Sequence, residues 1–125
     1  KVVSGYGLDA KIKFLGIRND IISLLAFVDC FVLPSRYEGL PIILLEAMVS
    51  GKPIVISDFE GGKGLIENEY NGLVVKIDDE RALANAMQTV QKNGALRERL
   101  SINALKSVEG FSIKKHVDNI LELMK

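Results

Sequence analysis

Two carboxylates, Glu38 and Glu46, flank the predicted start of a helix, with seven residues between them. Residues 42–49 are apolar at every position except Glu46, which is the pattern of a helix buried on all sides. An unpaired charge in such surroundings destabilises the fold, so Glu46 requires a hydrogen-bonding partner. A ligand hydroxyl is one such partner, because carboxylate oxygens accept hydrogen bonds.

The residues around Glu38 predict a strand, a short loop and a helix in succession. Residues 30–33 lack polar alternation, as in a strand buried on both faces of a parallel sheet. Gly39 permits a sharp turn, and Pro41 suits the first position of a helix. Ligands of open α/β sheets bind at the carboxyl ends of the strands, where helix N–H groups favour phosphate. Carboxylates beside an anion site suit a ligand that carries hydroxyls on both sides of its phosphates, such as a sugar joined through a diphosphate to a ribose.

This junction resembles the Glu-x7-Glu motif of the GT-B glycosyltransferases of family 4, also called group 1. The matching residues are Pro34, Ser35, Glu38, Gly39, Pro41 and Glu46. The resemblance implies that Glu38 is the catalytic residue and contacts hydroxyls of the donor sugar, and that Glu46 binds the ribose hydroxyls of the nucleotide. The alternative is structural: Glu38 would cap the helix, and Glu46 would pair with a nearby lysine or arginine.

The same resemblance implies further donor-binding residues. Ser35 belongs to the motif, and Gly39 and Leu40 would offer backbone amides to the sugar and the phosphate. Gly16 and Ile17 match the turn at which the family's backbone reads the edge of the base, although a plain strand-to-helix turn has the same pattern. No cofactor or metal is expected, because the sequence has no Asp-x-Asp, no HExxH and no cysteine cluster.

Short apolar runs predict four strands, at residues 11–16, 30–33, 54–57 and 73–75, with helical patterns between them. We therefore expect an α/β fold, a Rossmann-like parallel sheet with helices on both faces. By resemblance, residues 1–125 form one partial domain, the C-terminal nucleotide-sugar-binding domain of a GT-B fold, truncated on its N-terminal side. The family's domain opens with two earlier strands and with an Arg and a Lys that clamp the diphosphate, and an acceptor-binding domain precedes it. We expect all of these to be absent from this chain.

Two arrangements of the predicted sheet are open. If the four strands take positions three to six of a 3-2-1-4-5-6 sheet, the absent strands would separate residues 11–16 from the others. The strand at 31–33 would then present an open apolar edge. Residues 11–16 could instead pair beside 31–33 and close a four-stranded sheet.

Capping and turn residues predict the boundaries of the first elements. Asp20 begins a helix that runs to Phe27, and Gly51 ends the helix that contains Glu46. The Asn-Gly pair at 71–72 is a turn signal that begins the last strand.

Helical patterns fill the rest of the chain. Asp78 or Asp79 caps a helix. Its expected core face is Leu83, Ala86, Met87 and Val90. A second helix is expected at 95–108 and a last one from residue 111 onwards, where His116 is interpreted as a surface residue.

The glycine-rich residues 58–64 follow a predicted strand and are expected to form a flexible loop. In the family this loop lies near the donor, and a Glu usually follows the glycines. Here Gly64 and Leu65 occupy that region and the loop is one residue shorter, which weakens any transfer of the family's roles to it. We interpret Lys63 as a solvated lysine in preference to a phosphate ligand.

The 125 residues carry no formal net charge, with 48% hydrophobic and 26% charged residues. These values fit one globular domain and remove any argument for nucleic-acid binding. No apolar run reaches the roughly 18 residues of a membrane span.

Cys30 is the only cysteine, so no disulfide forms within the chain, as in a cytoplasmic protein. We expect Cys30 to be a small core residue.

The function implied by the resemblance is donor binding in a glycosyltransferase. Such an enzyme moves a sugar from a nucleotide diphosphate sugar to a glycan, lipid or polysaccharide acceptor, with retention and without a metal. The acceptor would bind through the absent domain, the chain alone would be inactive, and the full-length protein would work in the cytoplasm or at the inner face of the membrane. The alternatives are a non-catalytic nucleotide- or sugar-binding module and another GT-B enzyme such as a nucleotide-sugar epimerase.

Overall fold

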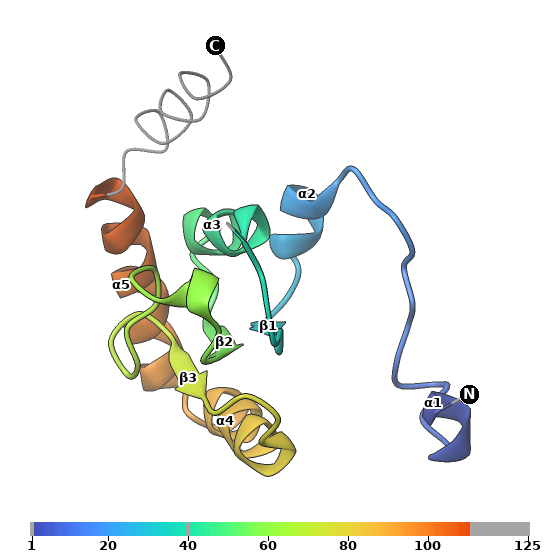
Figure 1. Ribbon diagram of the computed structural model, residues 1–125. Helices are drawn as coiled ribbons and strands as arrows, with labels where there is room; N and C mark the ends of the chain where they lie inside the picture. Colours follow the sequence, from blue (N-terminus) through green and yellow to red (C-terminus); the bar gives the residue numbers. More distant parts are fainter. Residues whose placement is uncertain (1, 40, 111–125) are drawn as a thin grey trace.

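The computed structural model describes residues 2–39 and 41–110 (Figure 1). In chain order its elements are α1 (Val2–Gly5), α2 (Ile21–Leu25), β1 (Phe31–Leu33), α3 (Ile42–Val49), β2 (Ile54–Ser57), the 3-10 turn η1 (Glu60–Gly62), β3 (Leu73–Val75), α4 (Glu80–Lys92) and α5 (Gly94–Gly110). Strands and helices alternate from β1 to α4, as an α/β fold requires.

The three strands form one parallel sheet in the order β1-β2-β3. Phe31 aligns with Ile54, and Val55 aligns with Leu73. All of β2 is buried in the middle of the sheet, whereas β1 at the edge is half-buried. The expected parallel sheet is confirmed. The expectation that residues 30–33 are buried on both faces is only partly correct. Phe31 and Leu33 pack against one core and Cys30 and Val32 against the other, but all four are only half-buried, and no described strand covers the outer edge of β1.

Helices cover both faces of the sheet (Figure 1), which confirms the expected Rossmann-like layering. On one face α3 and α5 contact each other over alternate residues of β2. This larger core includes Ile54, Ile56, Leu44, Met48, Phe59 and Ala104. On the other face Ala86 and Val90 of α4 pack against Val55. The side chains of β2 therefore alternate between two cores, as the pleat of a strand requires.

Residues 11–16, expected as the first strand, form no strand. They belong to an extended segment between α1 and α2 that stretches away from the rest of the molecule (Figure 1). A strand is stable only when another strand pairs with its N–H and C=O groups, and an apolar run by itself supplies no such partner. The four-stranded arrangement, in which residues 11–16 pair beside β1, is therefore wrong as well.

The end of α3 follows its predicted signal. Gly51 adopts a left-handed φ of 65° directly after the helix, where a residue with a Cβ would be strained. Its N–H donates to the carbonyl of Met48 at 3.1 Å, and the N–H of Lys52 donates to the carbonyl of Ala47 at 3.2 Å. This pair of bonds is a Schellman motif, which satisfies the last carbonyls of the helix.

The predicted starts of α2 and α4 are correct in position, but the start of α2 differs in its bonding. Asp79 caps α4, because its carboxylate accepts a backbone N–H of the first turn at 2.9 Å. Asp20 precedes α2 as predicted, but its carboxylate pairs with Arg18 at 2.5 Å and makes no cap bond. The helix also ends at Leu25, before the expected Phe27.

The predicted core face of α4 is correct at three of its four positions. Ala86 and Val90 are buried, and Leu83 is half-buried against the same core. Met87 is 45% exposed, so its prediction as a core residue is wrong. It lines a hollow beside Val32 at the open edge of the sheet, where no described element covers it.

The helix expected at 95–108 is α5, which runs from Gly94 to Gly110 and buries three residues at helical spacing. These residues are Leu100, Ala104 and Val108. The helix expected from residue 111, together with His116, lies outside the described residues.

Candidate functional site

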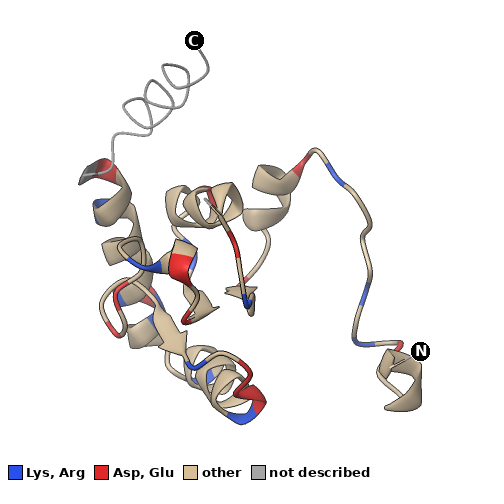
Figure 2. Cartoon of the chain, in the orientation of Figure 1, with Lys and Arg blue, Asp and Glu red and all other residues tan. Residues whose placement is uncertain are grey.

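Three loops meet at the carboxyl edge of the sheet, where each strand of a parallel sheet ends. The hydroxyl of Ser57, the last residue of β2, donates a hydrogen bond to the backbone carbonyl of Ser35 in the loop after β1. Arg36 of the same loop pairs with Asp78 after β3 at 2.7 Å. Figure 2 shows acidic residues in the loop between β1 and α3, at η1 and at the start of α4. The edge that sequence reasoning selected is thus a cluster of polar loops.

Glu38 lies half-buried in the loop after β1. Its Oε1 accepts a hydrogen bond of 3.0 Å from the hydroxyl of Ser35. The residue that precedes α3 is Pro41, one position before its expected place in the first turn. Among the described residues no side chain, Glu38 included, bonds the first N–H groups of this helix. The structural alternative, in which Glu38 caps the helix, is therefore wrong.

Glu46 is the fifth residue of α3 and is half-buried. The expectation of a helix buried on all sides is wrong, since Ile42 is 62% exposed and Val49 is 46% exposed. Within residues 2–39 and 41–110 no hydrogen bond or ion pair uses the carboxylate of Glu46, which removes the alternative of a lysine or arginine partner there. The structure thus leaves this carboxylate partly accessible and able to accept hydrogen bonds from a ligand.

The 3-10 turn η1 packs closely against the loop that contains Glu38. A Cβ added to Gly61 would lie 2.5 Å from the carbonyl oxygen of Glu38 and closer still to that of Gly39. Only a residue without a side chain permits this approach. The sequence analysis did not name Ser57 or Gly61 as part of the site. The available signal was their position, since Ser57 ends a buried strand and Gly61 lies in the loop that follows it.

Lys63 is exposed and pairs with Glu60 at 2.9 Å. The hydrogen bond to Glu60 and the charges of Glu60 and Asp58 raise the pKa of the Lys63 ammonium. This lysine is a solvated residue, as interpreted from the sequence. The loop at 58–64 was expected to be flexible, but it contains the η1 turn and the buried Phe59.

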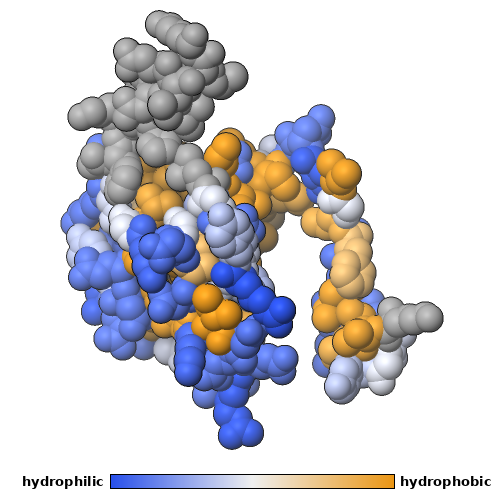
Figure 3. Space-filling model, viewed as in Figure 1, coloured by the Kyte–Doolittle hydropathy of each residue, from blue (hydrophilic) through white to orange (hydrophobic). Residues whose placement is uncertain are grey.

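Gly16 and Ile17 lie on the extended segment between α1 and α2. Gly16 has a φ of 68°, which fits the predicted turn, and Ile17 is fully exposed. Figure 3 shows apolar surface along this segment, apart from the body of the molecule. No hydrogen bond of the described residues joins this turn to Glu38, so the structure does not bring the two predicted subsites together. Leu40, another predicted donor-binding residue, lies outside the described residues.

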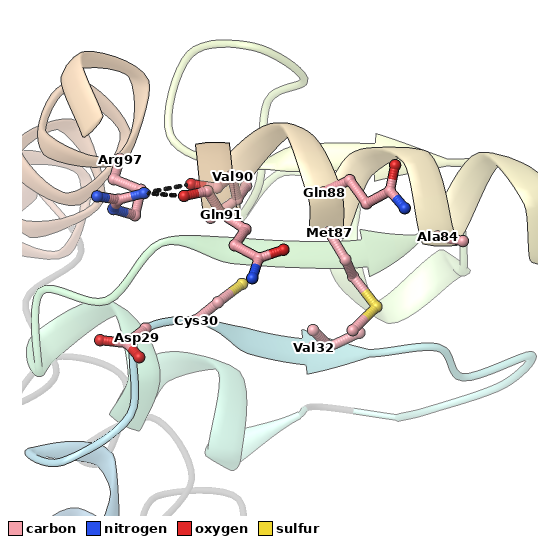
Figure 4. Close-up of a pocket in the computed structure, with 9 residues that line it drawn as sticks. All are labelled: Asp29, Cys30, Val32, Ala84, Met87, Gln88, Val90, Gln91 and Arg97. Carbon is pink, nitrogen blue, oxygen red and sulfur yellow. Dashed lines mark hydrogen bonds between the residues drawn. The ribbon is translucent and has the colours of Figure 1, made fainter. Parts of the chain in front are cut away.

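The hollow that Met87 lines has a volume of about 730 Å³ and lies between β1 and α4, on the face of the sheet away from α3 (Figure 4). Its lining is largely apolar and includes Val32 and Met87. Arg97 faces it but donates from Nη1 to the carbonyls of Val90 and Gln91, at 2.8 and 2.5 Å, and so satisfies the end of α4. This hollow is a consequence of the open sheet edge and contains no group that points to chemistry.

Cys30 lines the same hollow and is half-buried, not a fully buried core residue as expected. Burial and the charge of Asp29 raise the pKa of its thiol to about 11. The thiol is therefore protonated near neutral pH, and it donates weakly to the carbonyl of Phe31 at 3.6 Å.

The described part of the chain contains no group of three or more His, Cys, Asp or Glu side chains placed to hold a metal ion. None of its helices has both the length and the apolar character needed to cross a membrane.

Comparison with known sequences connects this geometry to a family. The model of the family described as glycosyl transferases group 1 matches residues 1–107. The chain is 37% identical over 116 residues to an Escherichia coli protein named UDP-Gal:alpha-D-GlcNAc-diphosphoundecaprenol alpha-1,3-galactosyltransferase. The aligned region covers 93% of this chain and 30% of that enzyme. It is 42% identical over 93 residues to N,N'-diacetylbacillosaminyl-diphospho-undecaprenol alpha-1,3-N-acetylgalactosaminyltransferase of Campylobacter jejuni. The aligned region covers 74% of this chain and 25% of that enzyme. The chain thus spans less than a third of the length of these two relatives.

Solved structures agree with the sequence comparison. HepE of Anabaena in complex with UDP-glucose superposes with a TM-score of 0.88 at 28% identity, over 98% of this chain and 34% of that chain. The C-terminal domain of LpcC, a glycosyl transferase group 1 family protein of Francisella tularensis, gives a TM-score of 0.76 at 25% identity, over 87% of this chain and 57% of that chain. The chain therefore belongs to the glycosyl transferases group 1 family and has the fold of the GT-B glycosyltransferases.

Proposed function

We propose that these residues form the donor-binding part of a glycosyltransferase. It transfers a sugar from a nucleotide diphosphate sugar to a glycan, lipid or polysaccharide acceptor, with retention at the reacting carbon. The observation that carries this proposal is the placement of Glu38 and Glu46 on either side of the N-terminal end of α3, at the carboxyl edge of the sheet. Glu46 lies four residues, or about 6 Å at ~1.5 Å per residue, along the helix from its first residue, Ile42. This separation suits two ends of one ligand.

Each carboxylate has a separate role in this proposal. Glu38 accepts hydrogen bonds from hydroxyls of the donor sugar with the carboxylate oxygen that Ser35 does not occupy. Glu46 accepts hydrogen bonds from the ribose hydroxyls. The diphosphate lies between them at the start of α3, where unpaired backbone N–H groups and the helix dipole favour an anion. The backbone of Gly39 and Leu40 adds further donors.

The relatives support a UDP-sugar as the donor. HepE binds UDP-glucose in its solved structure, and the name of the Escherichia coli relative contains UDP-Gal. Both curated relatives are named as transferases, which favours sugar transfer over a non-catalytic binding module or an epimerase. We also propose that Gly16 and Ile17 read the edge of the base. This assignment rests only on the match of these two residues to the family.

The acceptor is proposed to bind to a second domain outside these residues, and that domain would also be needed for catalysis. The acceptors in the names of both curated relatives are linked to diphosphoundecaprenol, a lipid. An acceptor of that kind would place the reaction in the cytoplasm at the inner face of the membrane, with peripheral contact by the full-length enzyme. Nucleic acid is not a proposed partner, since the chain has no net charge.

Replacing Glu46 by Gln in the full-length enzyme tests the nucleotide site. We expect the affinity for UDP and for the intact donor to fall about tenfold, because a hydrogen bond to a charged group contributes ~1.5–3 kcal/mol. Calorimetric titration measures both affinities. Glu98→Gln, at an exposed position on α5, is the matched control and should bind as the unmodified enzyme does. Unchanged affinity in Glu46→Gln would show that this carboxylate does not bind the ribose.

Transfer is expected to proceed in excess EDTA, because helix N–H groups and basic residues outside this chain are proposed to balance the diphosphate charge. The measurement is the initial rate of sugar transfer after dialysis against the chelator, with and without added magnesium or manganese. A rate that disappears with EDTA and returns with either ion would contradict the proposed metal-independent mechanism.

A further inference from the structure

We propose that Ser57 and Gly61 are positioning residues that fix Glu38 from the segment that follows the neighbouring strand. The inference rests on the proposed function, in that Glu38 is taken to contact the donor sugar. Neither residue belongs to the Glu-x7-Glu motif, and each restrains a different part of the loop at 34–39.

Ser57 acts on the Glu38 carboxylate through Ser35. Ser57 is 4% exposed, and its hydroxyl donates to the backbone carbonyl of Ser35. The hydroxyl of Ser35 in turn donates to Oε1 of Glu38 at 3.0 Å. The first bond holds the backbone from which the second bond is made. The Glu38 side chain is therefore oriented from β2, the most buried strand of the sheet.

Gly61 acts on the backbone of Glu38. Its missing side chain lets η1 lie against the carbonyl oxygens of Glu38 and Gly39, where a Cβ would overlap both. The η1 turn is itself anchored, because Phe59 before it is 1% exposed in the larger core and Gly62 at its end is buried. The turn thus restricts movement of the Glu38–Gly39 peptide towards η1.

Both restraints act on the same residue, Glu38, one on its side chain and one on its backbone, and neither contacts Glu46. The Ser57 hydroxyl bonds Ser35 and Gly61 approaches the Glu38–Gly39 peptide, both in the loop between β1 and α3, whereas Glu46 lies within α3. A loss of either restraint should therefore disturb the sugar end of the site and spare the nucleotide end. This selectivity separates a positioning role from a general contribution to folding.

The test uses the full-length enzyme with the substitutions Ser57→Ala and Gly61→Ala. We expect kcat to fall about tenfold for Ser57→Ala and about a hundredfold for Gly61→Ala. A misplacement of a group in the site by about 1 Å can lower the rate about a hundredfold. The affinity for UDP, measured by titration, should stay within about twofold of the unmodified enzyme. Equal losses in kcat and in UDP affinity would overturn the inference, since a general structural defect affects both.

Two matched controls remove similar groups elsewhere. Ser107→Ala deletes a hydroxyl that bonds Asn71 and the carbonyl of Asn103, and Gly94→Ala adds a Cβ near only the flexible end of Arg97. Both should keep the unmodified kcat. A loss in Ser107→Ala equal to that in Ser57→Ala would overturn the inference.

A double-mutant cycle shows whether Ser57 acts through Glu38. In a Glu38→Gln background, Ser57→Ala should lower kcat no further, whereas additive losses would overturn the inference. If Glu38→Gln alone leaves kcat unchanged, the proposed role of Glu38 fails. If Glu38→Gln lowers kcat and Ser57→Ala and Gly61→Ala do not, only the positioning inference fails. If Gly61→Ala does not fold, Ser57→Ala carries the test.

Discussion

Glu38→Gln is expected to lower kcat for sugar transfer by about tenfold to a hundredfold while UDP affinity changes by less than about twofold. The carboxylate lies beside the start of α3 and, in the proposed site, contacts the sugar and not the nucleotide. Interactions made with the reacting group affect the transition state more than the ground state, so their loss appears mainly in kcat. The loss of charge on a hydrogen-bond acceptor is worth ~1.5–3 kcal/mol, which sets the expected size.

Steady-state kinetics with the full-length enzyme and titration with UDP measure the two quantities. Glu60→Gln is the control, because Glu60 is another acidic residue at this edge, is exposed and pairs only with Lys63 among the described residues. It should retain the unmodified kcat. If Glu38→Gln weakens UDP binding as much as it slows transfer, the assignment of Glu38 to the sugar end of the donor is wrong.

Phe59→Ala is expected to lower the free energy of unfolding by about 3–5 kcal/mol, the usual cost of removing a fully buried aromatic side chain. Phe59 is 1% exposed and belongs to the larger core with Leu44, Met48 and Ile56. A domain is stable by only about 5–15 kcal/mol, so this one change removes a large share of its stability. Because Phe59 directly precedes η1, the loss should also release the turn that contacts Glu38.

Urea unfolding followed by far-UV circular dichroism measures this effect. Phe27→Ala is the matched control: the same atoms are removed from a side chain that is 87% exposed, and the midpoint should move little. Similar shifts for the two variants would mean that Phe59 is not part of the core.

Several elements were predictable because their signals are local. Pro41, Gly51 and Asp79 mark helix ends through their own backbone geometry or through bonds within one turn, and each stands within one residue of its predicted place. Three of the four predicted strands and their parallel arrangement are also confirmed. Short apolar runs separated by helical patterns have few other ways to bury their side chains.

The errors in predicting strand pairing and burial share one cause, which is that both depend on neighbours the local sequence does not specify. Residues 11–16 have the composition of a strand, but no strand within residues 2–39 and 41–110 pairs with them. Residues 31–33 and Met87 have the composition of a core, yet both stand at the open edge of the sheet and stay partly exposed. Glu46 was expected to need a partner because its helix is apolar, but α3 turns one side outward and leaves the carboxylate half-buried.

The sequence by itself determined the motif, the junction of strand and helix that carries it, and the edge of the sheet at which it lies. These follow from residues within about a dozen positions of one another, whose types restrict the backbone directly. Only the tertiary structure decided what holds Glu38. Ser57 is 22 residues from Ser35, and Gly61 meets the Glu38 carbonyl only because parallel strands end at a common edge and bring their loops together. Contacts of that kind depend on the path of the whole chain, so no local pattern of residues contains them.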